Sequence, residues 1–256
     1  MSALLFIYSA SLNAQWITTP DSSLQISPWG INVDACTDSN GGCYIAFTNF
    51  SYVKTRYYLQ KVNKFGYNEW ASPVMIGDTA NLCVRARLTP INNFSGVVAA
   101  YYARSVKDTI QARIIYTGKL FLQKIDDTGK LLWGTNGVRA SVDTFNQDGF
   151  EYPTVISDDS GGVFVMWADK RHDGTDVRGS LNVQRISPDG KRLWGDYGIQ
   201  IIDTLGNNTP VMEKTINGVV ILYVSKTETK LTKVDYDGNP VWTTMLSSES
   251  GKGFSK

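Results

Sequence analysis

The most polar stretch of the sequence is the segment 169–176, and its residue types could bind a metal ion. Asp169, Asp173 and Asp176 supply three carboxylates around a glycine, and calcium is a hard cation that prefers such oxygen ligands. The spacing differs from that of a twelve-residue calcium loop, however, and the guanidinium of Arg171 would compete for the same oxygens. We therefore predict an ion pair between Asp169 and Arg171 at a strand end and no metal, with calcium as the alternative.

His172 is the only histidine of the chain, which limits the chemistry that imidazole can supply. Zinc sites that need two histidines are excluded within one chain. A general base would need an orienting carboxylate and a nucleophile beside it, and the sequence has no Gly-x-Ser-x-Gly motif to supply the nucleophile. We interpret His172 as a solvated loop residue. A pair of carboxylates for glycoside hydrolysis stays open, because acids from different parts of the fold could meet.

Aromatic side chains offer a second kind of chemistry, since their faces can stack on sugar rings or anchor a protein partner. The tyrosines of the first half of the chain are concentrated at Tyr52, Tyr57, Tyr58, Tyr101, Tyr102 and Tyr116. Packing inside sheets is the simpler use of most of them. The candidate binding residues combine the polar segment with this aromatic region: Tyr102, Arg104, Asp169, Arg171, His172, Asp173 and Asp176.

The composition excludes several classes of function. The 256 residues carry 25 Lys and Arg against 24 Asp and Glu, a net charge of +1, whereas nucleic-acid binders usually show a basic excess or stripe. A hydrophobic fraction of 42% is too high for a disordered, strongly charged chain. The length corresponds to one or two domains at roughly 150 residues each, which is enough to bury a sizeable core.

Residues 1–14 have the pattern of a secretory signal peptide. An apolar run of about ten residues ends at small residues, where signal peptidases cut, although a basic residue before the run is missing. The run is far shorter than the roughly 20 residues of a membrane span, and no later stretch comes close. We expect a secreted or cell-surface protein whose mature chain begins at Gln15 or Trp16. The alternative is a buried N-terminal strand.

The three cysteines leave at least one thiol without a disulfide partner in the chain. Cys36 and Cys43 flank the turn-forming segment 37–42. If this segment is a tight hairpin, the two sulfurs face each other across neighbouring strands and a disulfide is geometrically possible. Two reduced thiols are the alternative. Cys83 has no evident partner and is expected to be a small buried hydrophobic residue.

Two motifs, each present four times in the same order, indicate the strands and turns on which these residues lie. The longer motif is an aliphatic, polar and basic stretch that begins at Leu59, Leu122, Val183 and Leu231. Every copy continues with a glycine seven residues later and a tryptophan four residues after the glycine: Gly66 and Trp70, Gly129 and Trp133, Gly190 and Trp194, Gly238 and Trp242. We predict a strand, a turn that uses the positive φ of glycine, and a tryptophan that fills the space between neighbouring sheets.

The shorter motif is a glycine followed by four mostly apolar residues and an aromatic residue, and its copies begin at Gly42, Gly96, Gly162 and Gly218. So short and continuous an apolar run indicates a central strand that is buried on both faces. Each unit adds an outer lead-in strand, such as residues 152–157, and a closing strand, such as residues 199–203. Four strands per unit correspond to one blade of a β-propeller.

We therefore predict an all-β fold of four four-stranded blades, which either close into a ring or form part of a larger propeller. The predicted boundaries of the repeat domain 15–256 are an N-terminal strand at 16–33 and blades at 34–82, 83–145, 146–207 and 208–256. A closed ring would make the chain a monomer. The long segments 103–119 and 170–180 each follow a Gly-led strand, so we expect them as loops at one common end of the blades.

The third repeat resembles the repeats of secreted bacterial β-propeller proteins, which often end in a C-terminal sorting domain. The resemblance rests on Ser157–Arg171, Asn182–Ile186 and Asp189–Trp194, and it extends over residues 15–245. The other repeats depart from the Trp-x-Asp-x-Arg pattern of Trp167–Arg171, and no sorting domain is recognisable in the sequence. The resemblance implies a propeller fold and export from a bacterial cell.

These observations predict a secreted, non-catalytic binding or scaffold module. Its ligand would be a protein or a glycan of unknown identity, bound at the end that carries the segments 103–119 and 170–180. We expect no nucleic-acid partner and no membrane span. The alternative function is an extracellular glycan-active hydrolase or lyase with acidic residues at the propeller channel.

Overall fold

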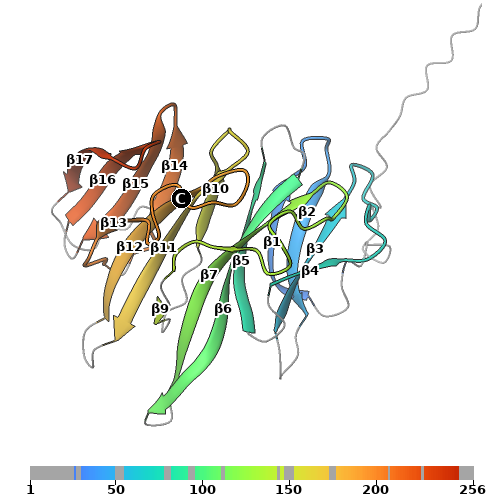
Figure 1. Cartoon of the computed structure of the whole chain (residues 1–256), viewed down its shortest axis with the longest axis horizontal. Coiled ribbons are helices and arrows are strands. Elements are labelled where there is room, and N and C mark those ends of the chain that lie inside the picture. The colour runs from blue at the N-terminus through green and yellow to red at the C-terminus, as the bar shows by residue number, and fades with distance from the viewer. Residues whose placement is uncertain are drawn as a thin grey trace, which may run out of the picture.

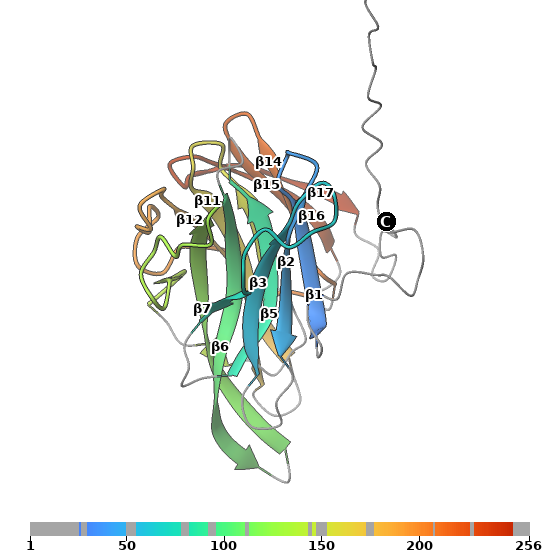
Figure 2. The same cartoon turned by 90° about the vertical axis from the view of Figure 1, so that its right-hand side faces the viewer.

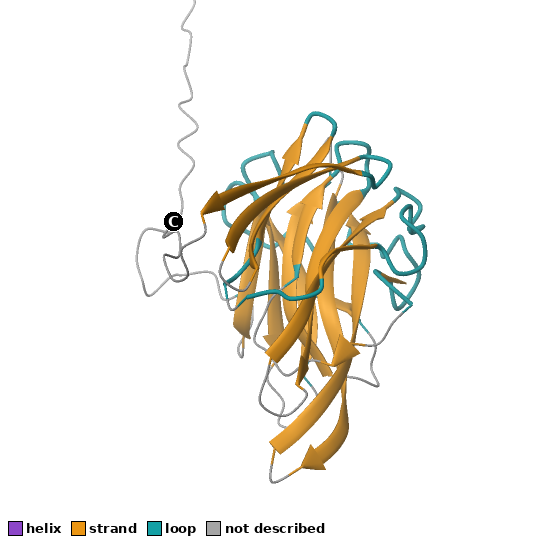
Figure 3. Cartoon of the chain, turned by 90° about the vertical axis from the view of Figure 1, so that its left-hand side faces the viewer, coloured by secondary structure: helices purple, strands orange, loops and turns teal. Residues whose placement is uncertain are grey.

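The computed structural model consists of strands and turns, and none of its described residues is helical (Figure 3). It describes residues 26, 30–49, 55–77, 82–91, 96–110, 113–142, 145–146, 153–172, 177–206, 208–225 and 228–247. The predicted signal peptide and most of the predicted strand 16–33 lie outside these residues.

The strands form four antiparallel sheets. The first sheet contains β1 (Gly30–Thr37), β2 (Cys43–Asn49), β3 (Arg56–Val62) and β4 (Val74–Ile76). The second contains β5 (Leu82–Pro90), β6 (Gly96–Ile110), β7 (Arg113–Asp126) and β8 (Val138–Arg139), and β9 (Phe145–Asn146) also pairs with β7. The third contains β10 (Thr154–Ser157), β11 (Val163–His172), β12 (Val177–Ile186) and β13 (Ile199–Ile202). The fourth contains β14 (Val211–Thr215), β15 (Gly218–Ser225), β16 (Glu228–Asp235) and β17 (Pro240–Ser247).

Each sheet is a meander in which strands consecutive in the chain are neighbours. Successive sheets contact each other through their first strands, since β1 packs with β5, β5 with β10 and β10 with β14. The lead-in strands, which we predicted to be outer strands, are therefore the inner ones, because the contact between sheets runs through them. Four-stranded meanders packed in succession are the blades of a β-propeller, which confirms the predicted fold class.

The four blades follow one another along the long axis of the molecule, with the first and fourth sheets at opposite ends (Figure 1). Among the described strands, no extensive contact joins the first sheet to the fourth. Figure 2, which looks onto the first sheet, shows that the axes of the strands in the different sheets are roughly parallel to one another. The described part of the chain thus forms consecutive sectors of a propeller.

The Gly-led strands form the core of the second and third sheets. Residues 97–102 of β6 and 163–167 of β11 are all at most 2% exposed, as expected for strands with a sheet packed on each face. The leading glycines are required by a close approach of the paired strand. A Cβ on Gly96 would lie 2.1 Å from the carbonyl oxygen of Ile125, and one on Gly162 would lie 2.3 Å from that of Ile186.

The tryptophan of each of the first three sheets packs on the turn of the next sheet, as the repeat predicted. Trp70 is 7% exposed, and its Nε1 donates a hydrogen bond of 2.8 Å to the carbonyl oxygen of Asp127. A Cβ on Gly129, whose φ is +87°, would lie 3.3 Å from this indole ring. The same contacts join Trp133 to Pro188 and Gly190, and Trp194 to Tyr236 and Gly238.

A buried glutamine ties each of these tryptophans to its own sheet. Gln184 is fully buried; its Nε2 donates to the carbonyl oxygen of Gly195 at 2.8 Å, and its Oε1 accepts the N–H of Trp194 at 2.9 Å. Gln123 makes the matching pair of contacts in the second sheet, and the Gln60 side chain donates to the Trp70 carbonyl in the first. The glutamine side chains replace the missing strand partner of the backbone groups at and next to the tryptophan. The outer strand of the sheet can therefore begin several residues after the tryptophan.

Candidate functional site

Two hairpins extend at the same end of the blades. The β6–β7 hairpin stays paired as far as Ile110 opposite Arg113, and the β11–β12 hairpin as far as His172 opposite Val177. The segments 103–119 and 170–180, which we predicted to be loops, are therefore mostly strand, because the ladder continues past the blade. The β6–β7 hairpin reaches well beyond the other strands (Figures 1 and 2).

Two of the predicted ligand-contacting residues on these hairpins are buried. Tyr102 is 1% exposed and belongs to the hydrophobic cluster between the second and third sheets. Asp169 is 6% exposed, and its backbone lies opposite Ser180 in the β11–β12 ladder. Their burial leaves these side chains little surface to offer to a ligand.

The other candidates lie farther along the hairpins. Arg104 is half-buried in β6, and the backbones of Arg171 and His172 complete β11. The side chains of Arg171 and His172, like the whole of Asp173 and Asp176, lie outside the described residues. The structure therefore places the described members of the candidate set on β6 and β11, the first strands of the two hairpins.

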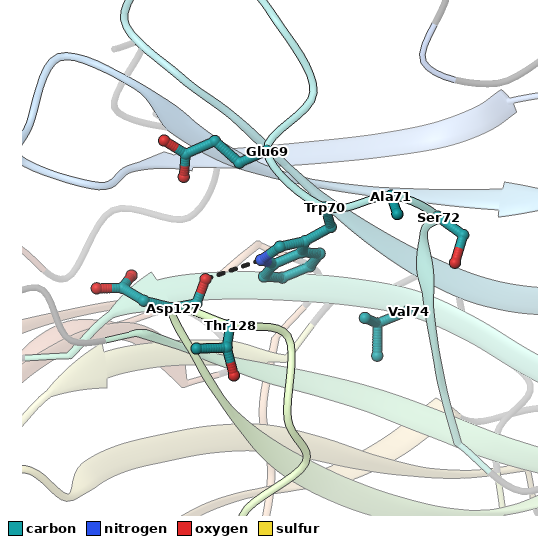
Figure 4. Close-up of a pocket in the computed structure, with 7 residues that line it drawn as sticks. All are labelled: Glu69, Trp70, Ala71, Ser72, Val74, Asp127 and Thr128. Carbon is teal, nitrogen blue, oxygen red and sulfur yellow. Dashed lines mark hydrogen bonds between the residues drawn. The ribbon is translucent and has the colours of Figure 1, made fainter.

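A shallow groove of about 630 Å³ lies where the first sheet meets the second (Figure 4). Its lining consists of Glu69, Trp70, Ala71, Ser72, Val74, Asp127 and Thr128. An indole ring with carboxylates and hydroxyl groups around it is a lining that could contact a polar ligand such as a sugar. The sequence indicated Trp70 only as a packing residue, because the groove depends on the turn of another repeat lying against it.

The carboxylates of this groove are engaged by one buried lysine. The Nζ of Lys61 lies 2.8 Å from the Glu69 carboxylate, 3.2 Å from that of Asp127 and 3.9 Å from that of Asp38. The side chains of Lys61 and Asp38 are only 8% and 2% exposed, and the hydroxyl of Tyr44 donates to Asp127. A buried cation needs such partners to offset its desolvation, so this cluster has a structural role at the junction of two sheets.

The pKa values at the cluster follow from the same contacts. Burial lowers the pKa of Lys61, but its hydrogen bonds to Glu69 and Asp127 outweigh burial, and the net pKa is raised. Burial raises the pKa of Tyr44, and so do its hydrogen bond to Asp127 and the charge of that residue. Lys61 thus stays charged and Tyr44 stays neutral around neutral pH, and neither is poised to transfer a proton there.

The third sheet repeats the ion pair of the first. Asp158 is 1% exposed, and its Oδ2 accepts hydrogen bonds of 3.0 and 2.9 Å from the guanidinium of Arg185. Its Oδ1 accepts the backbone N–H groups of Ser160 and Gly162. Asp38 caps the corresponding turn of the first sheet in the same way. The buried aspartates therefore fix turns, and the basic residue at the third place of the longer motif pairs with them.

Of the two alternatives for Cys36 and Cys43, the structure has the reduced thiols, and no disulfide joins them. Cys36 lies opposite Tyr44 and Cys43 opposite Thr37 in the β1–β2 ladder. The two cysteines are therefore one residue out of register, and their side chains point to opposite faces of the sheet. Cys83 is buried in the core, as expected.

Neither a metal cluster nor a membrane helix is found within the described residues. No group of three or more His, Cys, Asp or Glu side chains among them is arranged to hold a metal ion, and the segment 173–176 is not one of the described ranges. None of the described residues belongs to a helix that is long and apolar enough to cross a membrane.

These features show that the described residues form four blades of a β-propeller, and the comparisons with known proteins add only distant neighbours. No protein-family model matches the sequence, and no curated protein matches it. The structure is similar to the endo-arabinase from Bacteroides thetaiotaomicron, with 15% identity and a TM-score of 0.43 over 86% of this chain and 76% of that one. It is also similar to TcdA4 of Morganella morganii, with 12% identity and a TM-score of 0.35 over 80% of this chain and 10% of that one. Similarity at this level carries no argument about activity.

Proposed function

We propose that this chain is a secreted, non-catalytic binding or scaffold module, and that its binding surface is the end with the hairpins β6–β7 and β11–β12. The observation that supports this proposal is the length of the β6–β7 hairpin. Ordering residues beyond the body of a blade costs conformational entropy that contacts between blades do not repay. Contact with a partner repays it, and segments carried on a rigid scaffold are the usual place for binding residues.

The composition of the hairpin end favours a protein partner over a glycan. Residues 105–117 combine β-branched and aromatic residues with two basic side chains: Val106, Ile110, Ile114, Ile115 and Tyr116 with Lys107 and Arg113. Protein interfaces are enriched in tyrosine and arginine, with apolar residues at their centre. Secretion, expected from residues 1–14, would place this surface outside the cell.

The ion pairs weigh against the hydrolase alternative. A glycosidase needs two carboxylates that act as acid and as base or nucleophile. In the described residues, the most buried carboxylates are those of Asp38 and Asp158, and both cap turns and pair with Lys61 or Arg185. Carboxylates with these contacts stabilise the fold and are not free to act as a catalytic acid or base.

The test is to remove the hairpin and keep the blade. A variant in which Asn-Gly replaces residues 105–117 leaves Arg104 opposite Gly118 next to a two-residue turn, which suits an antiparallel hairpin. The full chain, this variant and the control I216N would be screened against extracellular proteins and a glycan array. Ile216 is 92% exposed in the β14–β15 turn, so I216N changes an exposed side chain elsewhere.

We expect the truncated chain to fold with an unchanged circular dichroism spectrum and to lose at least tenfold in affinity for any protein partner of the full chain. I216N should bind like the full chain. Equal binding by the truncated chain would contradict the proposed surface, and glycan turnover by purified full chain would contradict the non-catalytic function.

A further inference from the structure

The outer face of the fourth sheet differs from the corresponding faces of the first three. Trp242 occupies the same repeat position as Trp70, Trp133 and Trp194, yet it is 40% exposed, whereas the others are 7 to 8% exposed. Strand β17 is exposed along almost its whole length, with Val241, Met245 and Leu246 at 53, 56 and 50%. The fourth sheet therefore has the same sequence motif as the others, but its tryptophan is not buried.

The strand register shows which way this face points. Val234 and Val219 lie opposite each other and are fully buried in the cluster shared with the third sheet. Lys233, one residue before Val234, therefore points away from the third sheet. Because Trp242 lies opposite Lys233, its indole is on this same outward face.

The strand interior agrees with that direction. In β15, burial alternates along the strand, and Val220 and Leu222 are only partly buried between the buried Val219, Ile221 and Tyr223. The equivalent strands β6 and β11 are buried on both faces. The continuous apolar run 219–223 is typical of a strand that is covered on both faces. In the described residues only one of its faces is covered.

The three filled interfaces define what fits such a face. In each, the indole Nε1 donates to the carbonyl oxygen of the second residue of the next turn, and the turn glycine lies against the ring. The basic residue at the third place of the longer motif reaches the same turn: Lys61 contacts Asp127, Lys124 the Pro188 carbonyl, and Arg185 the Tyr236 carbonyl. Lys233 and Trp242 present this pair of donors on the fourth sheet.

We infer that the outward face of β14–β17 is a docking site for one further β-propeller blade of this repeat type. The partner blade presents an Asx-x-x-Gly turn. Its second residue accepts a hydrogen bond from the Trp242 indole through its backbone carbonyl, and its glycine lies against the ring. This site lies on the flank of the fourth blade and does not depend on the hairpin surface proposed above.

The test supplies such a blade. A second copy of residues 203–247 is inserted directly after Ser247 of the full-length chain. This segment is chosen because its turn Asp235–Gly238 already contacts Trp194 in the structure. Hydroxyl-radical footprinting with mass spectrometry then measures the oxidation rate of the original Trp242, which the added copy leaves in place. Tyr197, 62% exposed in the turn between β12 and β13, is the internal reference. The control chain carries G238V in the added copy only, since a Cβ there would lie 2.9 Å from the facing indole.

We expect the oxidation rate of the original Trp242 to fall at least fivefold in the extended chain, relative to Tyr197, and to stay unchanged in the G238V control. An extended chain in which this tryptophan is oxidised as fast as in the parent would overturn the inference, whether or not the added blade folds. A second comparison uses the parent chain. W194A should lower the melting temperature by about 5 °C or more, and W242A by less than about 2 °C. Equal losses would show that Trp242 is already covered and would also overturn it.

Discussion

A glycine in the turn between the third and fourth strands of the last sheet meets two demands at once. At Gly238, φ is +90°, a conformation that side chains with a Cβ adopt at a cost. The same position has no room for a side chain, because a Cβ would lie 2.7 Å from Ile199 and 2.9 Å from Trp194. Glycine is therefore required both by the turn and by the contact with the preceding blade.

The two demands can be separated by mutation. G238A should destabilise the protein by about 3 kcal/mol, since it adds a steric clash to the roughly 1 kcal/mol cost of positive φ. Gly195 has a φ of +74° and nothing within 4 Å of its added Cβ, so G195A should cost only about 1 kcal/mol. Urea unfolding of both variants measures the difference, and equal losses would mean that the blade contact at Gly238 contributes nothing.

Within each of the first three blades, the buried glutamine at the second place of the longer motif determines where the outer strand begins. In the first three sheets it ties the tryptophan backbone to the neighbouring strand, and the outer strands β4, β8 and β13 are short. In the fourth sheet Thr232 replaces it, and its hydroxyl hydrogen-bonds that of Thr243 across the ladder at 2.9 Å. There the eight-residue strand β17 pairs directly with β16 through six residue pairs.

Removal of this glutamine should weaken a blade strongly. Q184A leaves the buried N–H of Trp194 and the carbonyl of Gly195 without their side-chain partner, at a cost of about 2 to 4 kcal/mol. T232A in the fourth sheet removes hydroxyl–hydroxyl bonds to Tyr223 and Thr243 and leaves no backbone group without its partner, so it should cost about 1 kcal/mol. Thermal unfolding of the two variants provides the comparison. A smaller loss for Q184A than for T232A would rule out the role assigned to the glutamine.

The sequence predicted strands and turns well because these signals are local. The Gly-led strand and the Asx-x-x-Gly turn depend on residues within one repeat, and both lie where expected. The register of Cys36 and Cys43 was missed because a shift of one residue changes no local pattern and yet reverses the face. The inner position of the lead-in strands and the continued pairing of β6 with β7 depend on contacts between repeats, which a single repeat does not encode.

The candidate site was predicted less completely for a similar reason. The cluster of Asp38, Lys61, Glu69 and Asp127 draws on two blades, so no local motif contains it. A signal was present, since every copy of the longer motif has a basic residue at its third place. The polar side chains of Tyr102 and Asp169 suggested exposed positions, but both side chains are buried in the structure.

Across the whole molecule, the blades differ in how much of each sheet its neighbours cover. The second and third sheets are covered on both faces, and the fourth is covered on one. Because local stability follows the burial of a segment and its hydrogen bonds, the strands of the middle blades should open only with global unfolding. The fourth blade should open before them.

Hydrogen-exchange mass spectrometry of the full chain measures how strongly each blade is protected by its neighbours. We predict that amides of β6 and β11 exchange slowest, at the rate of global unfolding, and that those of β16 and β17 exchange at least tenfold faster, because one face of their sheet is open to solvent. Equal protection of β17 and β11 would contradict a succession of packed blades whose fourth member has an exposed outer face.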